Sequence, residues 1–487
     1  MIDVLLTHSY FMHFDPKQLR AMMPYPPLGT LYAASVLEAD GYRVQLFDTM
    51  LAHSEQELRA ALQHHQPKIL AIYDDDFNYL TKMCLTRMRE AAFKMSRIAK
   101  EFGAVVLVHG SDASDHYEQY LANGADAVMI GESENTLVEL SGHFVRHNGS
   151  VLGQIAGIAF LENGVLQRTL KREINKHLDA VPFPAWHLVD HQRYRTLWEK
   201  HHGYYSVNMV TTRGCPYHCN WCAKPVYGQV YHARSPENVV EELQYLQRTV
   251  RPDHIWFADD IFGLKPGWVQ QFSSLVQEKG MRIRFKIQSR ADLLTHENTV
   301  EALASAGCDE VWIGAESGSQ KILNAMEKGT TVQQIATARK LLHQHNVRTA
   351  FFLQFGYLGE TREDIRSTIR MVKDLLPDDI GISVSYPLPG TKFYEKVKSD
   401  LTIKQNWTDS DDLAMMYRST FSPAYYKQLH RYVHKVFRLR KGLVMLWHLV
   451  TRKATFGWTE IRQVVLILYY GPGIFIDRCK LLYHQMA

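Results

Sequence analysis

The sequence predicts an α/β protein with three parts: an N-terminal doubly wound parallel sheet, a partial (β/α)6 barrel and a small, mainly helical C-terminal region. Short apolar segments alternate with helical patterns over residues 1–140, and the alternation returns from Tyr204 to about Tyr394. Such alternation is typical of parallel sheets covered by helices. After residue 400 it gives way to basic and apolar helical patterns, which predict the third part.

The bulk composition is that of a globular protein with room for two or three domains, at 487 residues, 46% hydrophobic and 22% charged. Six cysteines in this length do not suggest a disulfide scaffold, so we expect a reducing, cytoplasmic compartment. The start of the chain, Met1 to Leu6, predicts a core strand rather than a signal peptide. No apolar run approaches the ~20 residues that span a bilayer.

Residues 1–145 form the first expected domain. Its strands are expected at Asp3–Thr7, Arg43–Phe47, Ile69–Tyr73, Ala104–Val108 and Ala127–Ile130. Its helices are expected at Leu28–Ala39, Glu55–His64, Thr81–Phe102 and Asp115–Asn123.

Ligands bind such sheets at the carboxyl ends of the strands. The candidate cleft residues at those ends are Ser9, Asp48, Gly110, Ser111, Gly131 and Glu132. Asp74–Asp76 also follows a strand, and we interpret it as a solvated loop in preference to a metal site.

Residues 146–203 are expected to link the first domain to the second. Pro182 and Pro184 interrupt the periodic pattern there, and proline restricts both itself and the residue before it. We therefore expect an extended segment, in which Trp186 and His187 pack rather than act.

Residues 204–400 are expected to form the partial barrel. Its strands are expected at Ser206–Thr211, His254–Ala258, Arg284–Gln288, Glu310–Ile313, Arg348–Phe355 and Gly381–Ser385. Its helices are expected at Pro236–Arg248, Pro266–Glu278, Asn298–Ala306, Val332–His345 and Thr361–Leu376. The chemistry of barrels takes place at the carboxyl ends of their strands.

Cys215, Cys219 and Cys222 follow the first of these strands with the spacing C-x3-C-x2-C. Three thiolates on one loop can bind three irons of a cubane iron–sulfur cluster and leave the fourth iron open. A closed zinc site needs four ligands, and the remaining cysteines, Cys84, Cys308 and Cys479, lie far apart in the sequence. The alternative is three ordinary buried cysteines.

The run Gly214-Cys215-Pro216, with Trp221 before the last cysteine, resembles the signature of the radical SAM superfamily. The resemblance implies a 4Fe-4S cluster that binds S-adenosylmethionine at its open iron and cleaves it to a 5′-deoxyadenosyl radical. It also implies an external electron donor such as flavodoxin or ferredoxin.

The first domain resembles the cobalamin-binding domains that are fused to radical SAM enzymes, through Pro26–Ala34, Gly41–Val44 and Val128–Glu134. The resemblance covers about residues 1–400 and implies a bound cobalamin. The motif D-x-H-x-x-G is absent, so no histidine is expected as the lower axial ligand, and Gly110-Ser111 replaces a Gly-Pro-His-like turn. The alternative is a degenerate domain that persists as a scaffold.

The same resemblance assigns contacts to S-adenosylmethionine at strand ends: Trp221, Asp259, Asp260, Ser289, Arg290, Glu316 and Ser317. Carboxylates suit the amino group of the ligand, arginine suits its carboxylate, and Glu316 suits the ribose hydroxyls. Asp259 could instead cap a helix, and Arg290 could form a surface ion pair with Asp292. Tyr357-Leu358 departs from the family pattern and is expected to alter the adenine packing or the substrate wall.

Residues 401–487 form the C-terminal region, in which Phe421 to Thr459 contain eight Lys/Arg and no Asp/Glu. Tyr425–Lys441 predicts a basic amphipathic helix, and Gly442–Val450 and Val464–Tyr470 are apolar runs. The region is expected either to cap the barrel or to contact a membrane surface peripherally, which would suit a lipid-like substrate. No nucleic-acid-binding module is recognisable.

The resemblance implies an enzyme that modifies an unactivated carbon of a small molecule, with methylation as the leading hypothesis. Radical cyclisation or rearrangement without methyl transfer is the alternative. Methylthio transfer is disfavoured because it uses a second cluster and Cys84 is the only cysteine of the first domain. A non-catalytic cobalamin or S-adenosylmethionine sensor, or a partner subunit, is the alternative of a different class. No general acid or base is identified; His201, His202, Tyr204 and Tyr205 are candidate pocket residues.

Overall fold

The computed structural model describes residues 2–82, 85–147, 151–222, 226–404, 406–451 and 457–486. Cys84 lies outside these ranges. The chain divides into two compact units. The first unit consists of Met1–Pro216, Lys224–Ile287 and Asn406–Asp412, and the second of Tyr217–Ala223, Gln288–Gln405 and Leu413–Ala487.

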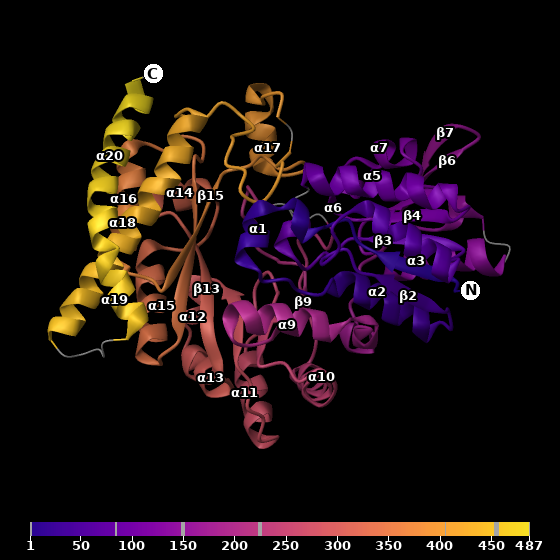
Figure 1. The fold of residues 1–487 in the computed structure, drawn as a ribbon, viewed down its shortest axis with the longest axis horizontal. Helices are drawn as coiled ribbons and strands as arrows, with labels where there is room; N and C mark the ends of the chain where they lie inside the picture. Colours follow the sequence, from indigo (N-terminus) through magenta and orange to yellow (C-terminus); the bar gives the residue numbers. More distant parts are fainter. Residues whose placement is uncertain are drawn as a thin grey trace. The chain divides into compact units, whose positions relative to one another are not determined.

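The first unit contains a seven-stranded sheet in the order β2-β1-β3-β4-β5-β6-β7 (Figure 1). Its strands are β1 (Val4–Thr7), β2 (Val44–Phe47), β3 (Ile69–Tyr73), β4 (Val105–His109), β5 (Ala127–Met129), β6 (Ile158–Glu162) and β7 (Val165–Arg168). β1 to β5 pair in parallel, whereas β6 and β7 pair antiparallel at the end of the sheet. The hairpin β6–β7 lies in the segment expected to be a linker and was not predicted.

Helices cover both faces of this sheet, so the predicted doubly wound architecture is confirmed. The helices of this part are α1 (Pro16–Ala21), α2 (Leu28–Ala39), α3 (Leu58–His65), α4 (Tyr79–Lys82), α5 (Thr86–Glu101), α6 (Ser111–Asp115), α7 (Tyr117–Ala122) and α8 (Glu134–Ser141). Side chains alternate along a strand. Leu5 of β1 therefore packs in the core with α3 and α5, while Val4 and Leu6 pack in the core with α2 and α8.

A second sheet has the order β15-β14-β13-β12-β11-β8. Its strands are β8 (Ser206–Met209), β11 (His254–Phe257), β12 (Phe285–Ser289), β13 (Cys308–Glu316), β14 (Arg348–Phe355) and β15 (Asp379–Val384). The helices of this part are α9 (His191–His202), α10 (Pro236–Thr249), α11 (Trp268–Glu278), α12 (Ala291–Leu294), α13 (Thr299–Ala306), α14 (Gln320–Ala325), α15 (Val332–Gln344), α16 (Arg362–Leu375) and α17 (Lys392–Val397). The six predicted strand–helix units are thus confirmed. A short antiparallel pair, β9 (Thr212–Arg213) with β10 (His232–Ala233), also lies in the first unit.

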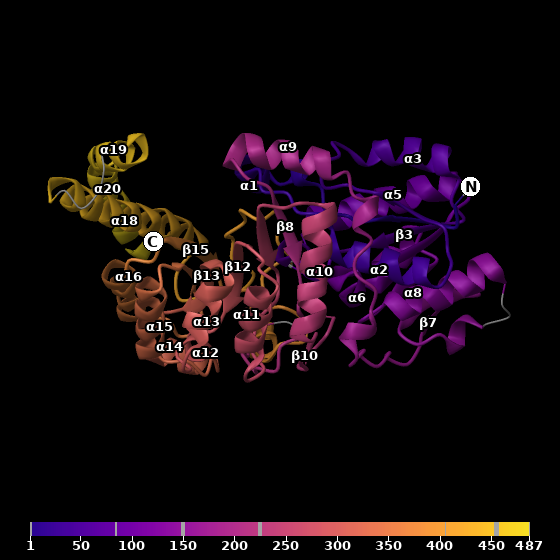
Figure 2. The same ribbon diagram turned by 90° about the horizontal axis from the view of Figure 1, so that it is seen from below.

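The C-terminal region is helical, as predicted, with α18 (Pro423–Val450), α19 (Trp458–Val465) and α20 (Ile467–Met486). Figures 1 and 2 both show α18 and α20 side by side. They run antiparallel, because Lys435 of α18 pairs with Asp477 at 2.8 Å while Tyr425 meets Gln485 at the other end. α18 also packs on α16 and β15. Among the described residues, no helix combines the length and the hydropathy needed to cross a bilayer.

Candidate active site

The cysteine loop follows β9, and Cys215, Cys219 and Cys222 are thiols that form no disulfide among the described residues. Cys215 is buried, and Cys219 and Cys222 are half-buried. The loop is anchored at its start by residues of the first unit and near its end by residues of the second.

Asp259, directly after β11, holds the start of the loop within the first unit. Its carboxylate accepts hydrogen bonds from the backbone N–H and the hydroxyl of Thr211, at 2.8 and 2.9 Å, and from the same two groups of Thr212, at 2.7 and 2.8 Å. Burial raises the pKa of Asp259 to about 6, although these four donors act to lower it. Asp259 is therefore a clamp on the strand that leads into the loop and does not cap a helix.

Asn220 holds the loop near its end within the second unit. Its backbone N–H donates to Met326 at 3.0 Å, and its side-chain Nδ2 donates to Ala325 at 2.8 Å. The hydroxyl of Tyr357 donates to Oδ1 of Asn220 at 2.7 Å. Tyr357 is buried and stacks on Phe393. Tyr357 thus contacts the cysteine loop, and the expected change in adenine packing or in the substrate wall remains a prediction.

Glu316 and Lys328 form a buried ion pair at 2.9 Å at the end of β13. Burial acts to lower the pKa of Lys328, but the charges of Glu316 and Cys219 outweigh it and raise that pKa. Nζ of Lys328 lies 5.9 Å from the ring centre of Trp221. Gly314 makes room for the lysine, because a Cβ there would lie 2.6 Å from Nζ. Lys328 therefore places a positive charge beside the cysteine loop in the second unit.

Arg290 is buried and lies flat on Tyr217, with its guanidinium carbon 3.6 Å from the ring centre. Its Nε also donates to Asp292 at 3.0 Å. The ion pair with Asp292 is thus present, but it is not a surface pair. The structure places a second cation against a residue of the cysteine loop.

The other predicted contacts have partners of their own. Asp260 pairs with Lys82 at 2.7 Å and is partly exposed. The hydroxyl of Ser317 bonds with that of Thr368 of α16 at 3.1 Å, and Ser289 is buried at the end of β12. Their contacts with S-adenosylmethionine remain predictions.

The residues of the loop fit an anionic cluster. Among the described residues, the indole N–H of Trp221 is buried and has no hydrogen-bond partner, so a bound group could serve as its acceptor. Thiolates bound to iron carry negative charge, which Lys328 and Arg290 would offset in the second unit. Asn220, Lys328 and Tyr357 were not predicted to hold the loop; Asn220 lies inside the cysteine motif and Tyr357 in a noted departure, whereas no motif includes Lys328.

The carboxyl edge of the first sheet contains buried aspartates. Asp74 accepts from the N–H of Ser9 at 2.7 Å and from its hydroxyl at 3.0 Å. Asp75 accepts from Gly29 N–H at 3.0 Å, and Asp76 pairs with His109 at 2.7 Å. Burial raises the pKa of Asp74, and it raises that of Asp75 to about 6. The interpretation of Asp74–Asp76 as a solvated loop is wrong, because all three carboxylates are buried and bond to the ends of neighbouring strands or to the start of α2.

Both strand-end histidines of this edge pair with aspartates through Nε2, and Nδ1 of His109 has no partner among the described residues. His8 is buried and bonds to Asp48 at 2.9 Å, which in turn accepts from Tyr194 at 2.6 Å. His109 is buried against Asp76. That no histidine is the lower axial ligand of cobalamin remains a prediction.

Gly110 and Gly131 follow β4 and β5 at the carboxyl edge of the first sheet, where they add no side chain. Gly131 has φ +80°, a left-handed conformation that favours glycine. At Gly110, a Cβ would lie 2.9 Å from the carboxylate of Asp74. Ser111 is buried beside Gly110. These positions suit close approach of a large planar ligand, but the individual contacts remain predictions.

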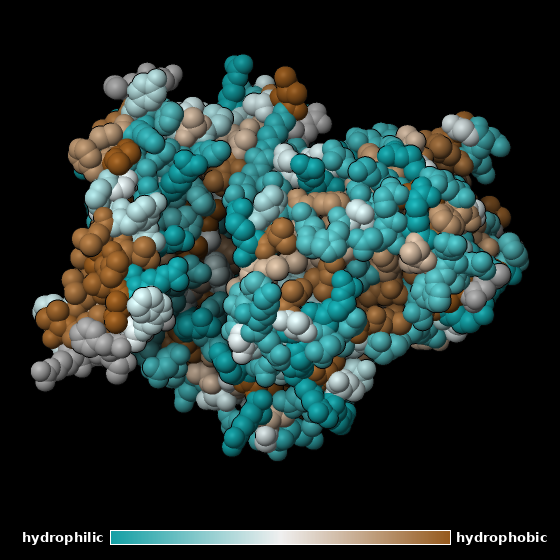
Figure 3. All heavy atoms as spheres, viewed as in Figure 1, coloured by the Kyte–Doolittle hydropathy of each residue, from teal (hydrophilic) through white to brown (hydrophobic). Residues whose placement is uncertain are grey.

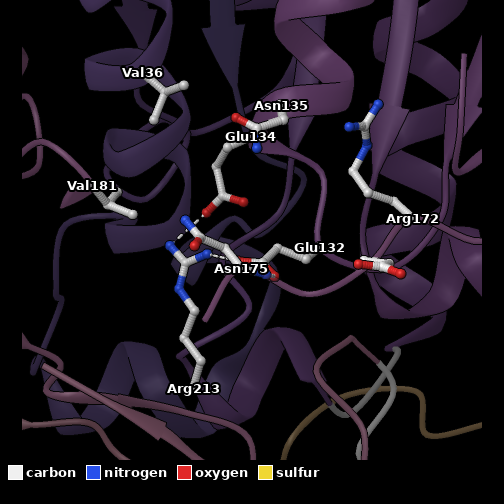
Figure 4. Close-up of a pocket in the computed structure, with 9 residues that line it drawn as sticks. Val36, Glu132, Glu134, Asn135, Arg172, Asn175, Val181 and Arg213 are labelled. Atoms are coloured by element: carbon white, nitrogen blue, oxygen red, sulfur yellow. Dashed lines mark hydrogen bonds and ion pairs between the residues drawn. The ribbon is translucent and has the colours of Figure 1, made fainter. Parts of the chain in front are cut away.

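Glu132 pairs with the guanidinium of Arg213, which also pairs with Glu134 at 2.7 Å. The contact of Glu132 with cobalamin remains a prediction. All three side chains are buried. They line a cavity of about 200 Å³ that also includes Asn135, Arg172 and Asn175 (Figure 4). Burial raises the pKa of Glu132 to about 7, against the charge of Arg213.

Two family models match the chain in the order of its domains. The B12 binding domain matches residues 20–141, and the radical SAM superfamily matches residues 209–372. The chain is therefore a radical SAM protein with a cobalamin-binding domain. Its cofactors are accordingly a 4Fe-4S cluster, S-adenosylmethionine and cobalamin.

The relatives include both methyltransferases and cyclases. An uncharacterized methyltransferase of Pyrococcus horikoshii is 28% identical over 78% of this chain and 81% of its own length. The anaerobic magnesium-protoporphyrin IX monomethyl ester cyclase of Cereibacter sphaeroides is 24% identical over 78% of this chain, which spans 61% of that enzyme. The structure of the cobalamin-dependent S-adenosylmethionine radical enzyme OxsB, with aqua-cobalamin bound, has the same fold. It aligns with a TM-score of 0.73 and 17% identity over 98% of this chain and 72% of that chain.

Proposed function

We propose that the protein is a cobalamin-dependent radical SAM methyltransferase that methylates an unactivated carbon of a small molecule. The observation that carries the proposal is the anchored loop with three thiols, Cys215, Cys219 and Cys222, in a chain that also has a cobalamin-binding domain. When bound, the cluster and S-adenosylmethionine supply a 5′-deoxyadenosyl radical, and cobalamin supplies a methyl group for transfer.

The residues of the chain have three tasks in this proposal. Asp259 and Asn220 keep the loop in place before iron arrives. Lys328 and Arg290 offer positive charge to the cluster thiolates or to the carboxylate of S-adenosylmethionine. Glu316, held by Lys328, is positioned to accept from ribose hydroxyls. The strand-end glycines of the first unit leave space for the corrin.

Radical cyclisation is the second candidate, because a relative in the comparison is a cyclase. The two reactions differ in their products. Methylation adds one carbon to the substrate, whereas cyclisation removes hydrogen and adds none. Transfer of a labelled methyl group from S-adenosylmethionine therefore distinguishes them.

The test begins with anaerobic reconstitution with iron, sulfide and hydroxocobalamin. We expect about four irons and one cobalt per chain, and formation of 5′-deoxyadenosine from S-adenosylmethionine after reduction. Exchange of Cys215, Cys219 or Cys222 for Ala should abolish that product and leave cobalamin binding intact. Iron uptake without any cleavage of S-adenosylmethionine would instead favour the sensor. A chain that takes up no iron would contradict both.

The partners belong to the proposal as well. We infer a cytoplasmic protein that receives its electron from a small donor such as flavodoxin or ferredoxin. The substrate is a small molecule, and a lipid-like one would agree with the exposed apolar side chains of the C-terminal helices.

A further inference from the structure

The turn of the C-terminal helical pair exposes apolar side chains at the end of α18, in α19 and at the start of α20. This tip surface consists of Leu443, Leu446, Trp447, Val450, Trp458, Ile461, Val465, Leu468 and Tyr469. The exposed fraction is 63% for Trp447 and 81% for Trp458. Figure 3 shows hydrophobic atoms gathered over this part of the chain.

These side chains belong to one compact group of helices. α18, α19 and α20 contact one another, and Gly442 lies so close to α20 that a Cβ would meet Ile467 at 2.9 Å. The apolar residues of α18 before Gly442, such as Leu429, Val433 and Phe437, are buried. The apolar residues of α18 after Gly442 are mostly exposed. The apolar character of the helix therefore continues beyond the part that the protein itself covers.

The charge around the tip surface is positive. From residue 438 to residue 470 the sequence contains six Lys/Arg and one acidic residue, Glu460. Arg438, Arg440 and Arg462 are exposed. A second copy of this chain would bring like charges together, which disfavours a symmetric dimer through this face. An anionic partner with an apolar interior complements both the charge and the side chains.

We propose that the tip surface docks on an anionic lipid bilayer. Tryptophan and tyrosine side chains prefer the boundary between headgroups and hydrocarbon, and helices with apolar and basic residues lie in that boundary. Each Lys or Arg near an anionic surface strengthens binding about fivefold. The docking goes beyond the proposed chemistry and does not depend on it, so vesicle binding and formation of 5′-deoxyadenosine can fail independently.

The experiment measures co-sedimentation of the full-length, reconstituted protein with two kinds of vesicle. One is phosphatidylcholine alone, and in the other about a third of the lipid is phosphatidylglycerol. We expect binding to the second kind, weaker binding to the first, partial release by salt, and a blue shift of tryptophan fluorescence. The double variant Trp447→Gln/Trp458→Gln should lose at least about tenfold in vesicle affinity.

Two further variants complete the design. Arg440→Gln/Arg462→Gln should lose binding to anionic vesicles and show little change on phosphatidylcholine. Leu170→Gln/Ile403→Gln is the matched control, because these side chains are 86% and 100% exposed and lie outside the tip surface. Unchanged thermal unfolding and iron content of each variant exclude misfolding. No binding to anionic vesicles, equal loss in the control, or a dimer that the tryptophan variants disrupt would overturn the proposal.

Discussion

Asp259 shows how one carboxylate can hold the strand that leads into a cofactor loop, while its contact with S-adenosylmethionine remains a prediction. Replacing it with Asn keeps the shape but turns an amide NH₂ toward the Thr211 and Thr212 donors. We expect Asp259→Asn to reduce the free energy of unfolding by about 1–3 kcal/mol, because buried donors lose their acceptor. It should also lower the iron content after reconstitution. Thermal unfolding and iron analysis check both.

Asp260→Asn is the matched control for that experiment, since Asp260 is the next residue and pairs only at a partly exposed site with Lys82. Exposed ion pairs contribute about 0–1 kcal/mol. Equal losses of stability and iron in both variants would contradict the assignment of the clamp to Asp259.

Glu360, in the second unit, should make the free energy of unfolding depend on pH. Its carboxyl is buried and accepts from Gly356 N–H at 2.6 Å, while Oε1 has no partner among the described residues. Burial raises its pKa to about 8 in the folded protein, from an unfolded value near 4.5. The folded state therefore holds the proton more tightly, and stability falls as the pH rises from about 4.5 through about 8.

Glu360→Gln should remove that dependence, because the amide cannot ionise. Each pKa unit corresponds to about 1.4 kcal/mol, so the variant should gain up to about 4 kcal/mol on the wild type between pH 5 and pH 9. Denaturant unfolding at the two pH values measures it. Glu363→Gln, whose side chain is 76% exposed, should not change the slope. A wild type with the same pH dependence as Glu360→Gln would show that Glu360 is not the cause.

At the site, the sequence revealed the residues that form contiguous motifs and missed those that come from distant segments. The three cysteines and Glu316 stand in short patterns. Lys328 and Tyr357 reach the loop only through the fold, 106 and 135 positions after Cys222. The burial of Asp74–Asp76 was misjudged for a related reason. Three acidic residues are usually solvated, but here Asp74 and Asp76 find partners at other strand ends and Asp75 finds one at the start of α2.

Among the elements, β9 is joined to the turn after β5 by one guanidinium. Arg213→Gln would leave Glu132 and Glu134 buried without their cation. Breaking a buried ion pair by removing one partner costs about 3–5 kcal/mol. We expect that loss in denaturant unfolding of Arg213→Gln, and partial recovery when Glu132→Gln is added, because one buried charge then disappears.

Arg43→Gln is the control for this element. It also removes a guanidinium that pairs with a carboxylate, Asp3, but Arg43 is 65% exposed. The loss of stability in Arg43→Gln should be much smaller than that in Arg213→Gln, because solvent screens an exposed ion pair. A failure of Glu132→Gln to recover any stability would indicate that lost packing, and not charge, accounts for the effect.

The elements themselves were largely predictable, because buried parallel strands and amphipathic helices leave regular patterns. β3, β14 and α2 begin and end where expected. The hairpin β6–β7 was missed since its strands are short and β7 is mostly exposed. Its turn contains Asn163-Gly164, both with positive φ, and this dipeptide is a strong hairpin signal that could have revealed it.

For the whole molecule, cobalamin and the iron–sulfur cluster should stabilise the protein independently of each other. Hydroxocobalamin at about 100 times its dissociation constant should add about 2.7 kcal/mol to the unfolding free energy. That corresponds to a rise of about 2–4 °C in Tm. Cys215→Ala should keep this rise and lose the iron. Calorimetry with and without hydroxocobalamin measures it, and a Tm that cobalamin does not change would argue that the first domain is only a scaffold.

Gly314 has an evolutionary consequence. Because the nearest atom to its missing Cβ is the ammonium of Lys328, a side chain at 314 would displace that ammonium from its place beside Glu316. Lineages that acquire a larger residue at 314 should therefore have replaced the lysine at 328 as well. The residue types at positions 314 and 328, which lie on either side of α14, should therefore change together.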